Sequence, residues 1–152
     1  MKIRYATEDN QNVIIEINSV NKLKTESNAA QIALIQILEG TVPIIYADDF
    51  KGFPVLRHLQ LSEHGIKEIR AGAFGGPVES VRLSKNKITT IEDGLFSNLT
   101  IHYLDLDHNL IEKISPHAFD NMPELRTLDL NDNKIQIVHQ EWFQGKPKLS
   151  VI

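Results

Sequence analysis

The segment that decides the fold is IHYLDLDHNLIEKISPHAF (101–119), which spaces apolar residues in a fixed cadence that ends at Phe119. The same cadence recurs in IALIQILEGTVPIIYADDF (32–50), LRHLQLSEHGIKEIRAGAF (56–74), VESVRLSKNKITTIEDGLF (78–96) and LRTLDLNDNKIQIVHQEWF (125–143). The phenylalanines that close the copies recur every 22 to 24 residues: Phe50, Phe74, Phe96, Phe119 and Phe143. Five copies in one register predict a repeat architecture.

Each copy contains an alternation of the Leu-x-Leu kind, which is typical of a short strand with one buried face. One unit of this size cannot bury that face alone, so stacked neighbours must enclose a continuous core between them. We therefore expect parallel strands along one side of the stack and the phenylalanine column as a spine along the other.

The cadence resembles the leucine-rich-repeat family, L-x-x-L-x-L-x-x-N-x-I-x-x-I-x-x-x-x-F-x-x-L, over about residues 32–152. Its period is similar to that of extracellular-type repeats such as Toll-like receptor ectodomains. The resemblance implies an α/β-class solenoid with a parallel β-sheet on the concave face and irregular or 3-10 turns on the convex face. It also implies that Asn86, Asn109 and Asn133 bond backbone groups of the turn leaving each strand. His64 holds the same position, and we interpret it as a local substitution, not a ligand.

The segment before the repeats is expected to cap the N-terminal end of the core. KIRYA (2–6) and VIIEI (13–17) both have the alternation of side chains that is typical of a strand, and TEDNQN, which is rich in turn-forming residues, lies between them. We predict a strand pair whose inward side chains are Val13, Ile15 and Ile17. We interpret KTESNAAQ (24–31) as a polar connection into the first full repeat. The predicted cap is therefore residues 1–31.

Residues 32–152 are expected to hold five full repeats and the start of a sixth, in one continuous domain with the cap. LSVI (149–152) begins that sixth repeat and places Leu149 and Ile152 on the template. Two explanations remain open: the chain is truncated there, or a partner or a second copy covers the last repeat. The role of Trp142 also has two explanations: it is an exposed contact for a next repeat, or it packs under the final turn, which we favour.

The concave strand surface is the candidate binding face, because residues between the core leucines point outward along a strand. Its central column is Gln36, Gln60, Arg82, Asp105 and Asp129. Acidic and hydrogen-bonding groups gather in the last two strands, with Tyr103 as an aromatic anchor. The predicted ligand-binding residues are Arg82, His102, Tyr103, Asp105, Asp107, Asp129 and Asn131. The alternative is that these acidic residues are ordinary solvated surface.

Two stretches, DLDHN (105–109) and DLNDN (129–133), resemble the opening of a calcium loop. Such a loop needs glycine at its sixth position and glutamate at its twelfth. Those positions hold Leu110 and Pro116 after the first stretch and Lys134 and Gln140 after the second. Both stretches also belong to predicted strands, so we predict no metal site.

Other function classes find little support in the composition. The chain has 152 residues, no cysteine and a net charge of −4, which disfavours thiolate chemistry and nucleic-acid binding. No apolar run long enough to span a membrane and no catalytic or cofactor motif is present in the sequence. We therefore predict that the protein is not an enzyme, needs no cofactor, binds no nucleic acid and has no membrane span.

The predicted function is a protein-binding module that recognises a protein ligand through the concave strand surface. The alternative is a structural solenoid that self-associates through its uncapped C-terminal end. The phrases ADDFKGFP and PHAFDNMP look similar to arthropod leucine-rich immune proteins, which suggests innate immune recognition. Although MKIRYATEDNQ at the N-terminus lacks the apolar core of a signal peptide, we expect an extracellular or secreted protein, with a glycan on Asn98 of the sequon Asn98-Leu99-Thr100.

Overall fold

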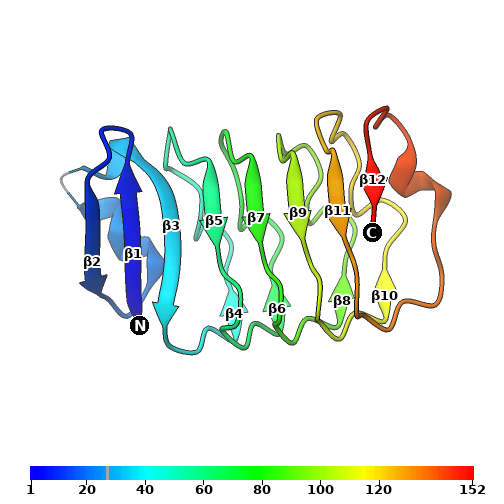
Figure 1. Ribbon diagram of the computed structural model, residues 1–152, viewed down its shortest axis with the longest axis horizontal. Coiled ribbons are helices and arrows are strands. Elements are labelled where there is room, and N and C mark those ends of the chain that lie inside the picture. The colour runs from blue at the N-terminus through cyan, green and yellow to red at the C-terminus, as the bar shows by residue number, and fades with distance from the viewer. Residues whose placement is uncertain (27) are drawn as a thin grey trace.

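The computed structural model describes residues 1–26 and 28–152, which stack along one eight-stranded sheet (Figure 1). The strand order is β12-β11-β9-β7-β5-β3-β1-β2. The strands are β1 (Lys2–Thr7), β2 (Asn12–Glu16), β3 (Ile32–Glu39), β5 (His58–Gln60), β7 (Ser80–Arg82), β9 (Tyr103–Asp105), β11 (Thr127–Asp129) and β12 (Ser150–Val151). From β3 to β12 all neighbours are parallel, which is the predicted solenoid.

The register of the sheet follows the sequence template. Leu59 pairs with Val81, Val81 with Leu104, and Leu104 with Leu128. All four side chains are fully buried, so each strand supplies its apolar residue to one shared core. We call the outer surface of this sheet the concave strand face.

The opposite side of the stack consists of short strands and 3-10 turns, as expected. Two small parallel sheets pair β4 (Ile44–Ile45) with β6 (Glu68–Ile69) and β8 (Thr90–Ile91) with β10 (Lys113–Ile114). Three 3-10 helices complete it: η1 (Val20–Thr25), η2 (Ala29–Gln31) and η3 (Gln140–Phe143). No α-helix occurs in the described parts of the chain.

Buried asparagines tie each repeat to its neighbour. Asn86 donates its side-chain amide to the carbonyl oxygens of Leu61 (3.0 Å) and Leu83 (2.9 Å). Its Oδ1 accepts the backbone N–H groups of His64 and Ile66, both at 3.0 Å. Asn109 and Asn133 donate to the equivalent carbonyl oxygens one and two repeats later, and each accepts one backbone N–H, from Ile88 and Ile111. The expected structural role of this column is confirmed.

His64 holds the asparagine position in the second repeat, but both of its ring nitrogens contact carbonyl oxygens of the first repeat. Its Nδ1 lies 2.8 Å from the carbonyl oxygen of Gly40 and its Nε2 lies 2.8 Å from that of Ile37. The imidazole therefore bridges two repeats in place of an asparagine amide, and its position in the core agrees with a local substitution.

The aromatic spine runs along the stack but ends differently from the prediction. Phe50, Phe74, Phe96 and Phe119 stack with ring centroids 5.7 to 6.1 Å apart. Trp142, which is 1% exposed, takes the next place, 6.1 Å from Phe119 and edge-on to it. Its indole N–H donates to the carbonyl oxygen of Ser115 at 3.2 Å. The assignment of Phe143 to the spine was wrong, because that side chain is 45% exposed.

The N-terminal strand pair caps the core as predicted. β1 pairs antiparallel with both β2 and β3 and buries Ile3 and Tyr5. Val13, Ile15 and Ile17 are partly buried and pack against the same core.

The cap also covers the turn side of the first repeat, which the sequence reading missed. The predicted polar connection, 24–31, contains the end of η1 and all of η2, while Ser27 lies outside the described residues. η1 buries Val20 and Leu23, and the side-chain amide of Asn21 donates to Asp49 at 3.1 Å. The cap therefore closes both layers of the stack.

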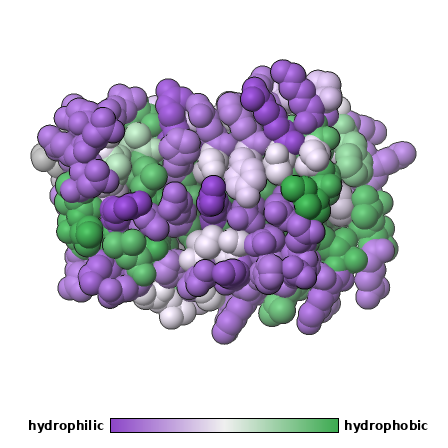
Figure 2. Space-filling view, viewed as in Figure 1, coloured by the Kyte–Doolittle hydropathy of each residue, from purple (hydrophilic) through white to green (hydrophobic). Residues whose placement is uncertain are grey.

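Apolar side chains are exposed at the opposite end, around β12. They are Ile137, Val138, Phe143, Val151 and Ile152. In Figure 2 hydrophobic residues gather over the β12 end and over the β1–β2 end of a mostly hydrophilic strand face.

The adjacent aromatic residues of η3 test the assignment of the spine. Replacing Trp142 with Ala removes a fully buried ring and should lower the free energy of unfolding by about 3–5 kcal/mol. Replacing Phe143 with Ala removes an exposed ring and should change it by less than about 1 kcal/mol. Urea unfolding measures both, and equal losses would contradict the assignment.

Candidate functional site

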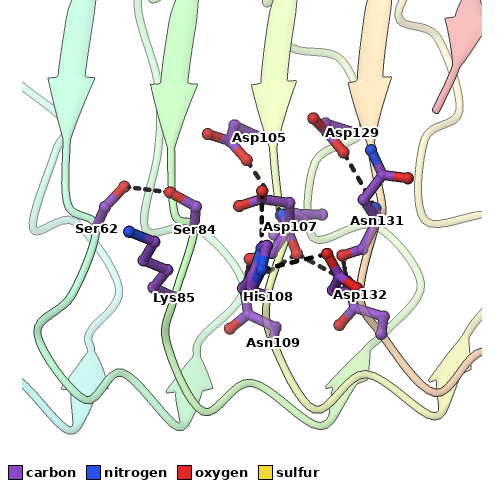
Figure 3. Close-up of polar contacts among 12 residues, drawn as sticks. Ser62, Ser84, Lys85, Asp105, Asp107, His108, Asn109, Asp129, Asn131 and Asp132 are labelled. Carbon is purple, nitrogen blue, oxygen red and sulfur yellow. Dashed lines mark hydrogen bonds and ion pairs between the residues drawn. The ribbon is translucent and has the colours of Figure 1, made fainter.

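The predicted binding residues lie together on the C-terminal half of the concave strand face. Figure 3 shows four of them: Asp105, Asp107, Asp129 and Asn131. Arg82 pairs in register with Asp105, and Asp105 with Asp129, so these three side chains occupy neighbouring strands. Tyr103 lies in register with Ser80 and Thr127. His102 precedes β9 and is half-buried, whereas Asn131 follows β11 and is exposed.

Asp105 is more buried than the strand pattern predicted. Its exposure is only 8%, and its Oδ1 accepts the backbone N–H of Asp107 at 3.1 Å. The Oδ1 of Asp129 accepts the backbone N–H of Asn131 in the same way, at 3.0 Å. Both carboxylates therefore support the bend at the end of their strand, and the expectation that Asp105 is an exposed contact residue needs correction.

Burial raises the pKa of Asp105, and the nearby charges of Asp107 and Asp129 raise it further, against the bond from the Asp107 N–H. The three carboxylates have oxygen atoms within 4.8 Å of one another. Clusters of acidic side chains occur on proteins without a bound ion, so we assign no metal to this one. Their chemical consequence is a concentrated negative charge, which favours a basic or hydrogen-bond-donating partner.

Arg82 and Tyr103 form the other polar feature of this surface. The guanidinium of Arg82 lies over the Tyr103 ring, 5.5 Å from its centroid. Within the described residues it makes no ion pair, although Asp105 is its strand neighbour. Burial raises the pKa of Tyr103, and the charge of Asp105 adds to this effect. The charge of Arg82 lowers the pKa of Tyr103 in turn. Because no described residue forms an ion pair with it, the Arg82 guanidinium keeps N–H donors for a partner.

The strand face changes character along the stack. Towards the N-terminus from the acidic residues, the hydroxyls of Ser62 and Ser84 bond each other at 2.8 Å. Gln36 and Gln60 continue the column on β3 and β5. A neutral half thus adjoins a charged half, with Arg82 at the boundary.

Sequence reasoning missed the role of His108. Its Nδ1 lies 3.0 Å from an Asp107 oxygen and its Nε2 lies 3.2 Å from an Asp132 oxygen. In the same position of an earlier repeat, Lys85 pairs with Glu63 at 3.2 Å. The sequence does contain a signal for these pairs, because Glu63, Lys85 and His108 each immediately precede the template asparagine or, at His64, its substitute.

Other candidate features lie away from this surface. Asn98 is exposed in a turn, where its Oδ1 accepts the side-chain amide of Asn121 at 3.1 Å, and its glycan stays a prediction. A hollow of about 440 Å³ lies at the N-terminal end, lined in part by Val42, Tyr46 and Asp49. The described chain holds no helix with the length and apolar character needed to cross a membrane.

Known proteins with similar sequences share the repeat. The leucine rich repeat family matches residues 54–111, 77–123 and 100–152. Leucine-rich repeats and immunoglobulin-like domains protein 3 of Homo sapiens is 33% identical over 137 residues, which are 86% of this chain and 12% of that protein. Leucine-rich repeat-containing protein 3 of Danio rerio is 46% identical over 87 residues, which are 56% of this chain and 32% of that protein.

Leucine-rich repeat-containing protein 3B of Homo sapiens is 45% identical over 73 residues, or 45% of this chain and 28% of that protein. The chain thus spans between about an eighth and a third of the length of these relatives. Proteins of this kind are generally non-enzymatic modules that bind other proteins, which supports a protein-binding role here. Together with the parallel stack and its asparagine column, the matches show that the chain belongs to the leucine-rich-repeat family.

Proposed function

We propose that the protein is a binding module that recognises a protein ligand through the C-terminal half of its concave strand face. The observation that carries this proposal is the side-by-side placement of Arg82, Tyr103 and the carboxylates on neighbouring rigid strands. Arginine and tyrosine are the residues that most often dominate binding energy in interfaces.

The proposed partner presents both signs of charge. A carboxylate or carbonyl group would accept from Arg82, and a lysine or arginine would meet Asp107 and Asp129. Adjacent strands lie roughly 4.8 Å apart, so two residues of one extended segment can contact Arg82 and the carboxylates at the same time. An extracellular location and an immune role stay predictions.

A charge swap tests this surface. The double variant R82E/D129K reverses both charges and leaves the net charge unchanged, and E68K/R70E does the same to an exposed ion pair off the strand face. A displayed library of extracellular protein fragments is selected against the wild type. We expect the strand-face swap to weaken the selected binders by about tenfold or more, since interface anchors contribute at this level. The E68K/R70E control should bind normally.

Thermal unfolding confirms that both variants fold, and R82E alone serves as a second strand-face variant because Arg82 is exposed. Binders that keep their affinity for R82E/D129K and R82E would contradict the proposal. Binders lost only by E68K/R70E would place recognition on the other side of the solenoid.

We propose self-association through the β12 end as the second candidate. The exposed apolar side chains there, among them Phe143 and Ile152, form a surface suited to another copy of the chain. Sedimentation velocity over a concentration series should show dimers, and I137K/V151K should yield monomers, because charges on this surface oppose apolar contact. A wild type that sediments as a monomer at every concentration would rule this candidate out.

A further inference from the structure

Four side chains form a column beside the strand face, one in each successive turn. They are Glu63, Lys85, His108 and Asp132, and their backbones share the left-handed region, with φ of 69°, 54°, 47° and 52°. Because stacked turns repeat one conformation, the side chains meet their neighbours. Lys85 pairs with Glu63, and His108 pairs with Asp132, both at 3.2 Å. Figure 3 shows Lys85, His108 and Asp132 along this edge.

His108 is held on both sides by carboxylates. Its Nδ1 faces Asp107 at 3.0 Å and its Nε2 faces Asp132 at 3.2 Å. Nδ1 hydrogen-bonds to Asp107, whereas the contact of Nε2 with Asp132 is an ion pair, which requires the positive charge of the imidazolium. The observed arrangement is therefore complete only in the protonated form.

The charged groups around His108 come from three turns. Asp107 belongs to its own turn, Asp132 to the next and Lys85 to the previous one. The hydrogen bond with Asp107 raises the pKa of His108 above its ordinary value, and the charge of Asp132 raises it further. Desolvation and Lys85 act in the opposite direction, and Lys85 is itself paired with Glu63.

We propose that His108 is a proton-dependent clamp that joins the turn after β9 to the turn after β11 and thereby regulates the acidic half of the strand face. When His108 is protonated, Asp107 and Asp132 are both bound and the local negative charge is reduced. When it is neutral, one carboxylate is released and the surface becomes more negative. The clamp needs only the residues named here, while its effect on a partner rests on the proposed function.

The direction of the pH dependence follows from the raised pKa. Below the unfolded value of about 6.5 the clamp contributes its full stabilisation, because the group is protonated in both states and paired only in the folded one. This contribution is lost as the pH rises through the higher folded value. Histidine is the side chain whose charge normally changes between about pH 5 and 8.

Histidine titration by NMR tests the clamp directly. D132N removes the carboxylate charge and keeps a residue that tolerates left-handed backbone. The titration midpoint of His108 should fall in D132N and stay unchanged in D120N, which instead removes the partner of His117. An unchanged His108 midpoint in D132N would overturn the clamp.

Thermal unfolding supplies a second measurement. The melting temperature of the wild type relative to H108N should be higher at pH 6 than at pH 8.5. A difference that does not depend on pH would also overturn the clamp.

A binding measurement tests the regulatory part. The probes are basic protein fragments selected in the charge-swap experiment. Their affinity for the wild type should rise about two- to fivefold from pH 6 to pH 8.5, the range that exposed ion pairs give. The rise should be smaller for H108N, and an equal rise in both proteins would overturn regulation by His108. The NMR measurement uses no ligand, so failure of the charge-swap experiment bears on the proposed function alone.

Discussion

The bonds of the asparagine column are the interaction on which the rest of the structure depends. The sheet strands from β5 to β12 are only two or three residues long, so the chain must turn sharply and leave backbone groups inside the stack. Asn109 satisfies such groups in two repeats at once: it accepts from the N–H of Ile88 and donates to the carbonyl oxygens of Leu83 and Leu106. The column thereby fixes both the turn and the spacing between repeats.

That spacing determines which polar and charged side chains lie next to one another on the concave strand face. Once Leu104 and Leu128 are locked in register, Asp105 and Asp129 must lie beside each other, despite the repulsion between their charges. The same register sets His108 against Asp132. Charge on this protein is therefore arranged by the core, and the surface residues can differ between repeats without changing the fold.

The sequence predicted the repeat, the sheet and most of the core because one apolar template recurs five times. It failed where two residues competed for one place: Trp142 and Phe143 are adjacent aromatics, and the larger ring with its N–H bond to Ser115 occupies the spine. It also missed η1, since a six-residue 3-10 helix that buries only Val20 and Leu23 is too short for a periodic signal.

The candidate site was predicted as a set of neighbours but not in its details. Strand alternation placed Arg82, Asp105 and Asp129 on one face, and the register pairs them as expected. Alternation could not show that Asp105 bends back onto the Asp107 N–H and becomes buried, because such a bond depends on the turn that follows the strand. The link from His108 to Asp132 likewise depends on left-handed turns that the apolar template does not encode.

Urea unfolding of N109A tests the central role of the asparagine column most directly. The substitution leaves buried backbone groups of two repeats without partners, and we expect a loss of about 2–4 kcal/mol in the free energy of unfolding. The neighbouring exposed residue supplies the control, since L110A should change it by less than about 1 kcal/mol. A loss in N109A no larger than in L110A would contradict the account.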